Sequence, residues 1–196
     1  MTQVPREHQD LIRRVLAANY FELAIERMWI DEIVDGETVV KARVNERAQV
    51  AEVEGKGVGV VDALFHALLA RYAVEYQSLK TIRLAGFSVS ADIDGKETST
   101  DAMGTVTIDV TNSDQRRFTF SDSSRSVTAS IARATVAVVQ YFINAERAFI
   151  TLFNARKDAL ERGRADLVAR YTAELSEVVE STSYAEVIES KKRELR

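Results

Sequence analysis

Residues 55–65 read Gly55-Lys56-Gly57-Val58-Gly59-Val60-Val61-Asp62-Ala63-Leu64-Phe65, and this stretch decides the fold because strand-like alternation gives way to helical periodicity within it. It holds three of the eight glycines of the chain. We interpret it as a glycine-rich turn at residues 55–59 that leads into an amphipathic helix. The first turn of a helix has backbone N–H groups without internal acceptors, and these can face an anion. The stretch therefore predicts either a small-ligand site or a tight turn that only joins strand to helix.

Three segments of alternating apolar residues precede this turn, and a helix follows it. The segments centre on residues 21–30, 40–44 and 51–53, with a turn at Asp35-Gly36 and a β-bulge near residues 27–29. The helix has one apolar face at positions i, i+3, i+4, i+7 and i+11, formed by Val61, Leu64, Phe65, Leu68 and Tyr72. This part of the chain therefore has the predicted order β-β-β-α.

The same order returns in the second half of the chain. Alternating apolar residues predict strands at residues 87–93, 104–110 and 118–120, with a polar loop at residues 96–101. A Ser-rich turn at residues 121–124 leads into a long helix that begins near Ser126. We interpret the two units as an internal duplication. Short turns between the strands predict antiparallel sheets with helices on one face, an α+β fold.

Helical segments flank the two units. The predicted boundaries are an N-terminal helix over residues 1–19, the duplicated domain over residues 20–154 and a C-terminal helical extension over residues 155–196. The extension ends in an amphipathic piece formed by Tyr184, Val187, Ile188 and Leu195. Such an extension is typical of a docking or oligomerisation helix, or of a partly mobile tail.

Composition argues against several classes of function. The net charge of −4 disfavours nucleic acid as the main partner, because binding phosphate needs a basic face. The chain has no cysteine, which excludes disulfides, thiol nucleophiles and cysteine-ligated metals. No apolar run reaches the roughly 18 residues that span a bilayer, and the N-terminal residues do not resemble a secretory signal. We therefore expect no membrane partner and a cytoplasmic location.

Groups that could carry catalysis are few. The only histidines, His8 and His66, form no metal-binding pair on one element, and we expect His66 on a helix surface. Two acid pairs, Glu52 with Glu54 and Asp92 with Asp94, share a strand face, which fits either a divalent ion or solvent-facing acids. The serines at residues 121–126 have no histidine nearby, so they fit helix capping or contact with a ligand. We predict no catalytic residue, metal or cofactor.

The element order and the sequences at both helix starts resemble the regulatory (allosteric, dimerisation) domain of 2-isopropylmalate synthase and citramalate synthase. The first unit of that family ends in a Gly-x-Gly-Pro-Val/Ile-Asp-Ala turn, and residues 57–63 match it with Val60 in place of proline. The second unit has Ser-x-Asp-Ile/Val-Ile-x-Ala-Ser, and residues 123–130 fit it with Arg125 at the aspartate position. The resemblance covers residues 21–149.

This resemblance implies a dimeric regulatory domain that binds an end product such as leucine or isoleucine between subunits. The chain is too short to include the catalytic barrel of those synthases and lacks its His-x-His metal motif, so the resemblance implies a stand-alone domain and no enzyme. Carried over residue by residue, the two walls of the pocket consist of Gly57, Gly59, Val60 and Asp62, and of Ser123, Ser124, Arg125, Ala129 and Ser130.

Arg125 alters the expected ligand, because a guanidinium favours an anionic group where the family has an acid. The ligand class therefore widens from an amino acid to keto acids and dicarboxylates. The expected function is a cytoplasmic homodimer that senses a small carboxylate in leucine biosynthesis and modulates a separately encoded synthase. The alternative is a dimerisation module with a degenerate pocket and no ligand.

Overall fold

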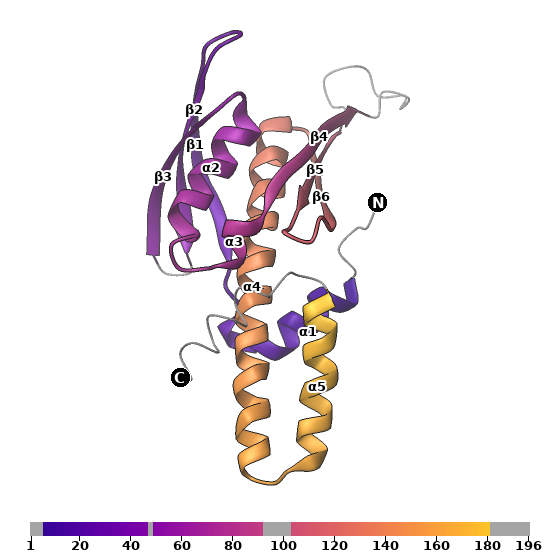
Figure 1. The fold of residues 1–196 in the computed structure, drawn as a ribbon. Helices are drawn as coiled ribbons and strands as arrows, with labels where there is room; N and C mark the ends of the chain where they lie inside the picture. The colour runs from indigo at the N-terminus through magenta and orange to yellow at the C-terminus, as the bar shows by residue number, and fades with distance from the viewer. Residues whose placement is uncertain (1–5, 47–48, 92–102, 181–196) are drawn as a thin grey trace.

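The computed structural model describes residues 6–46, 49–91 and 103–180, and these form two βββα units (Figure 1). The first unit comprises β1 (Leu23–Glu32), β2 (Thr38–Glu46), β3 (Gln49–Gly57) and α2 (Val60–Tyr72). The second comprises β4 (Arg83–Ala91), β5 (Gly104–Thr111), β6 (Arg117–Ser124) and α4 (Val127–Glu161). Each unit has its own antiparallel sheet with its strands in sequence order. The α+β fold with duplicated βββα units is confirmed.

The duplication extends to irregular details of the two sheets. The register of β1 against β2 shifts between Ile25 and Arg27, and that of β4 against β5 shifts between Leu84 and Gly86. Each shift lies near the start of the first strand of its unit, and the shift in β1 lies within two residues of the bulge predicted at residues 27–29. A bulge leaves one residue unpaired and increases the local twist. Both sheets therefore bend at equivalent places.

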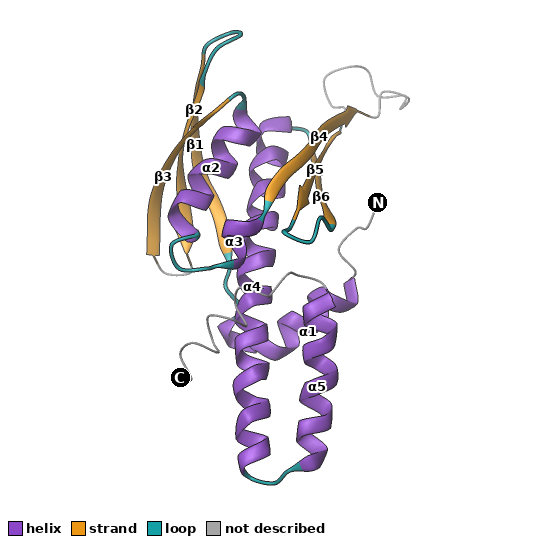
Figure 2. Ribbon diagram, in the orientation of Figure 1, coloured by secondary structure: helices purple, strands orange, loops and turns teal. Residues whose placement is uncertain are grey.

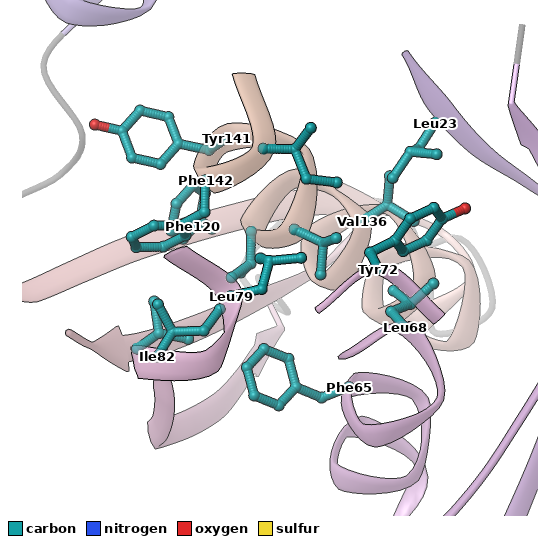
Figure 3. Close-up of a cluster of buried hydrophobic side chains, with 14 of the residues drawn as sticks. Leu23, Phe65, Leu68, Tyr72, Leu79, Ile82, Phe120, Val136, Tyr141 and Phe142 are labelled. Carbon is teal, nitrogen blue, oxygen red and sulfur yellow. The ribbon is translucent and has the colours of Figure 1, made fainter. Parts of the chain in front are cut away.

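Helices α2 and α4 lie between the two sheets (Figure 2). Helix α2 packs on β2 and β3, whereas α4 packs on β5 and β6 and also reaches α2 and β1. The apolar face predicted for α2 is buried along its whole length. Side chains from α2, α3 and α4 meet in one core, as Figure 3 shows for Leu68, Leu79 and Phe142. The two units therefore share one hydrophobic interior.

Shorter elements complete the fold: α1 (Arg6–Leu16), the 3₁₀ turn η1 (Ala17–Asn19), α3 (Ser78–Thr81) and α5 (Ala165–Glu180). Helix α5 runs back along α4, and α1 packs against both (Figure 1). Nη2 of Arg14 on α1 lies 3.2 Å from Oε1 of Glu174 on α5. Helix α4 crosses the predicted domain boundary at residue 154 as one continuous helix, and that boundary stays a prediction.

The structure corrects both predicted turns. Residues 55–57 are the end of β3, so only Val58 and Gly59 separate the strand from α2. Residues 121–124 likewise belong to β6, which leaves Arg125 and Ser126 before α4. Glycines and serines suggested turns because both are common in them, but here they lie in strands. The polar loop at residues 96–101, Asp92 with Asp94, and the amphipathic piece at residues 184–195 lie outside the described residues.

Helix α4 qualifies the expectation that no segment could span a membrane. By length and composition it is apolar enough to cross a bilayer, the one such helix in the described part of the chain. Within its most apolar window, 67% is buried inside the protein. This is the pattern of a core helix, because its apolar side chains pack against both sheets and α2.

Candidate functional site

The junction between β3 and α2 depends on two glycines that allow the helix to approach the strand. A Cβ on Gly55 would lie 2.5 Å from the backbone N of Ala67, and one on Gly57 would lie 2.5 Å from the backbone N of Ala63. Real Cβ atoms do not come this close to backbone, so a side chain at either position would push the helix away. Close packing of α2 on β3 therefore accounts for a glycine at both positions.

Gly59 differs from them, because a Cβ built there meets nothing within 4 Å. It is the N-cap of α2 with extended dihedral angles (φ −171°, ψ 175°) that any residue adopts. Oδ2 of Asp62 accepts a hydrogen bond from the N–H of Val58 at 3.1 Å. Oδ1 of Asp62 lies 3.7 Å from Nε2 of His66, which is exposed on the helix surface as predicted. The start of α2 is thus open at Gly59 and acidic at Asp62.

Serine hydroxyls organise the junction between β6 and α4. The side chain of Ser126 caps α4 by accepting a hydrogen bond from the N–H of Ala129 at 3.2 Å. Oγ of Ser124 lies 2.9 Å from Oγ of Ser130, which is fully buried. The Ser124 hydroxyl also donates a hydrogen bond to the carbonyl O of Ser126 at 2.9 Å. Helix capping is therefore confirmed for Ser126, and the three hydroxyls bond to one another or to the backbone at the start of α4.

An ion pair secures the same junction one turn further along. Nε and Nη2 of Arg133 donate to the two carboxylate oxygens of Asp122 at 3.0 and 2.8 Å. These hydrogen bonds lower the pKa of the Asp122 carboxyl below its usual value. Ser123 on the other face of β6 is 2.7 Å from the hydroxyl of Thr105, and Arg125 is exposed at the turn. The start of α4 is therefore fixed to β6 by charge and by hydroxyl groups.

A groove of about 590 Å³ runs between β1 and the first half of α4. It is lined by residues 23–28 of β1 and by Ser126, Thr128, Ala129, Ala132, Arg133, Val136, Ala137 and Gln140 of α4. Small and aliphatic side chains form its floor, and Glu26 and Arg133 add charges. The guanidinium of Arg27 instead lies over the ring of Trp29, 5.8 Å from its centroid. This size and mixture are typical of a site for a small molecule.

Two amides of α4 hold β1 against this groove. Oε1 of Gln140 accepts a hydrogen bond from the N–H of Leu23 at 2.8 Å. Oδ1 of Asn144 accepts from the N–H of Phe21, and Nδ2 of Asn144 donates to the carbonyl O of Phe21, both at 2.7 Å. Asn144 is fully buried, so its amide replaces the partners that a neighbouring strand would supply. The groove is therefore a built feature of the fold and depends on both units.

This element order and the two helix starts have a counterpart among known domains. Residues 6–143 match the family of the LeuA allosteric (dimerisation) domain. The chain belongs to this family. No curated protein matches the chain. The LeuA allosteric domain is a regulatory domain of its synthase rather than the catalytic one. The match ends inside α4, so the second half of α4 and α5 lie beyond it.

The predicted site residues of this LeuA-type domain fall at two separate junctions. Gly57, Gly59, Val60 and Asp62 lie at the junction where β3 ends and α2 begins. The others, Ser123, Ser124, Arg125, Ala129 and Ser130, lie at the end of β6, directly after it, or in the first turn of α4. Of these nine residues, Ala129 lines the groove. Their assignment to a ligand stays a prediction.

Sequence reasoning missed the β1 side of the groove and the two amides that hold it. Gln140 and Asn144 interrupt an otherwise apolar stretch of helix, and polar residues in such a stretch signal a buried partner. Glu26 and Arg27 interrupt the apolar alternation of β1 in the same way. These four residues could have indicated that β1 and α4 meet.

The acidic residues weighed as metal ligands have other partners. Glu52 pairs with Arg43, and Glu54 pairs with Lys41, across neighbouring strands. Within residues 6–46, 49–91 and 103–180, no three acidic or histidine side chains gather closely enough to hold a metal ion. The groove therefore offers binding groups and no metal centre among the described residues.

Proposed function

We propose that this domain is a cytoplasmic, non-catalytic homodimer that binds a small carboxylate and modulates a separately encoded synthase. The observation that carries the proposal is the groove between β1 and the start of α4, inside the region that matches the LeuA allosteric domain. Bound ligand would favour one arrangement of the dimer over another, and the partner enzyme would respond to that difference.

The charges of the groove suit an amino acid or a keto acid. The N-terminal end of α4 attracts a carboxylate through its backbone N–H groups, and Arg133, which also lines the groove, adds a positive charge. Glu26, at the bulge, supplies the negative group that the ammonium of an amino acid needs. Arg125 cannot supply it, because its side chain is positively charged. Ala129, Ala132 and Val136 leave an apolar floor for an aliphatic side chain.

Thermal denaturation with three probes tests this proposal: leucine, 4-methyl-2-oxopentanoate and succinate, each at millimolar concentration. A ligand at 100 times its Kd stabilises the folded state by about 2.7 kcal/mol, so binding raises the Tm. Arg133→Gln is expected to lose the shift for every probe that binds. Glu26→Gln is expected to lose the shift for leucine and to keep it for the keto acid.

A matched pair of variants locates the site. Ala129→Leu fills the groove and is expected to abolish the shift, whereas Ala70→Leu makes the same change on the exposed side of α2 and should leave it intact. If none of the probes stabilises the protein, the sensor function is contradicted.

The second candidate function is the dimerisation module without a ligand, and the serine network favours it. The hydroxyls of Ser124, Ser126 and Ser130 already bond to one another or to the start of α4. A dimer that no probe stabilises supports this candidate. Cell fractionation tests the cytoplasmic location, and recovery in the membrane pellet contradicts it.

A further inference from the structure

The two units leave their first strands in different environments. In the first unit, α4 packs over β1, and the amides of Gln140 and Asn144 hold the strand's start. In the second unit, β4 packs mainly on β5, and no helix contributes substantial packing to it within the described residues. The helix-facing side of β4 therefore lacks the cover that α4 gives to the start of β1.

Phe87 and Val89 lie on that helix-facing side. They pair with Ile108 and Val106 of β5, which are fully buried, and directly paired residues of antiparallel strands share a face. Phe87 and Val89 are nevertheless both 46% exposed. Large apolar side chains on the core side of a sheet are expected to be covered, so their exposure indicates a missing partner.

The same surface continues onto α4. A Cβ on Gly104, which pairs with Ala91, would lie 3.0 Å from Cγ2 of Val127, the first residue of α4. Val127 is 39% exposed. We define the β4 face as Phe87, Val89, Ala91 and Val127. It borders the predicted ligand residues Ser124 and Arg125.

We propose that a second copy of this chain packs on the β4 face, so that the two β4 faces contact each other around a two-fold axis. This proposal rests on the homodimer of the proposed function and identifies the surface through which the two copies contact each other. An isologous interface places each patch against itself, so like charges would repel. The β4 face has no charged residue, and the one charge within β4 is Arg83 at its far end.

A second exposed apolar surface, at the connection of β1 to β2, does not suit a contact with itself. The connection of β1 to β2 exposes Ile33 and Val34, but Asp31, Glu32, Asp35 and Glu37 surround them. Two copies of this tip would bring eight acids together against two lysines, because Nζ of Lys56 lies 2.8 Å from Oε1 of Glu37 in each copy. The remaining excess of negative charge costs energy in an isologous contact. Charge therefore distinguishes the two surfaces and favours the β4 face as the dimer contact.

Sedimentation equilibrium of the full chain and its variants tests this interface. Phe87→Glu with Val89→Glu, and separately Val127→Glu, place charges on the β4 face and are expected to raise the dimer dissociation constant about 100-fold or more. Val127→Glu adds an acid to the first turn of α4, which favours the helix, so the variant retains its fold. Val74→Glu, at an exposed site after α2, is the matched control and should leave the dimer unchanged.

Disulfide trapping gives a second readout because the chain has no cysteine of its own. Phe87→Cys and Val89→Cys are tested singly under mild oxidation, and at least one is expected to form covalent dimers. Val34→Cys is the control at the acidic tip and should stay monomeric on a denaturing gel.

The outcomes separate this inference from the proposed function. If the glutamate variants remain dimeric, or if Val34→Cys cross-links as readily as Val89→Cys, the interface is wrong while the dimer stands. If the unaltered chain is a monomer at all concentrations, the dimer itself is contradicted, and the proposed function with it.

Discussion

The β3–α2 junction and the β6–α4 junction occupy equivalent places in the two units but use different chemistry. The helices begin at Val60 and Val127, 67 residues apart. At this offset Gly57 corresponds to Ser124 and Ala63 to Ser130. Where the first unit brings a glycine against an alanine, the second has two hydroxyls 2.9 Å apart.

The same offset relates Gly55 to Asp122 and His66 to Arg133. In the first unit, Gly55 lets the helix backbone approach the strand, whereas in the second Asp122 holds the helix through the guanidinium of Arg133. One topology therefore accepts two kinds of contact between strand and helix. The first depends on glycines and does not tolerate an added side chain. The second depends on polar side chains, so it responds to substitution and to pH.

The largest expected effect comes from adding a side chain at the first junction. Gly55→Val places a Cβ against the backbone of Ala63 and Ala67, and we expect a loss of about 3 kcal/mol in the free energy of unfolding. Gly59→Ser is the control, because its Cβ meets nothing and serine is a good N-cap, so stability should change by less than about 0.5 kcal/mol. Urea denaturation measures both. Equal stability of the two variants would contradict close packing at Gly55.

Loss of the amide that holds β1 is expected to have the next largest effect. Asn144→Ala leaves the N–H and C=O of Phe21 without their partners in a buried place, which costs about 2 kcal/mol. Thr151→Ala, on an exposed turn of the same helix, is the control and should cost much less. Hydrogen exchange at the start of β1 should accelerate only in Asn144→Ala. Unchanged exchange there would show that α4 does not hold β1.

The serine pair at the second junction is expected to contribute less. Ser130→Ala removes one buried hydroxyl from the pair and is expected to cost about 1 kcal/mol. In a double-mutant cycle with Ser124→Ala, the coupling energy should be about 0.5 kcal/mol or more, because the two hydroxyls are in contact. Thermal or urea denaturation supplies the four stabilities. Strict additivity would indicate that the hydroxyls do not interact.

The smallest expected effect is that of the ion pair, and it depends on pH. Arg133 lowers the pKa of Asp122 in the folded protein, so the carboxylate stabilises the fold above its unfolded pKa of about 4. The contribution is lost as the pH falls through the lower, folded pKa. At pH 7, Asp122→Asn is expected to cost less than about 1 kcal/mol because the pair is partly exposed. Denaturation curves from pH 2 to pH 7 should converge at the acidic end, whereas a constant difference would exclude the ion pair as the cause.

Local periodicity was sufficient to predict most elements of the fold. The stripe from Val61 to Tyr72 specified α2, and alternating apolar residues specified the six strands, because each pattern depends only on neighbours in the chain. The predicted ends of β3 and β6 were wrong because glycine and serine favour turns locally. These glycines and serines lie in strands because a helix packs over them, and that contact is a tertiary one that local sequence does not reveal.

The candidate site was less accessible to sequence reasoning than the fold. Ala129 and Ser126 were placed at the start of α4 correctly, but the opposite wall of the groove belongs to β1, about 100 residues earlier in the chain. No local pattern connects segments so far apart. The polar residues Gln140 and Asn144 were the available sign that α4 accepts a strand at its side.

Helix α4 lies partly inside and partly outside the region that matches the LeuA family. It begins beside the groove and ends at the connection to α5, beyond the last matched residue, 143. Its 35 residues form a rod about 52 Å long, so a tilt of about 5° at one end moves the other end by about 5 Å. Residues 127–143 lie inside the match and residues 144–161 beyond it, so the helix connects the groove to the tip of the α4–α5 hairpin through two segments of nearly equal length.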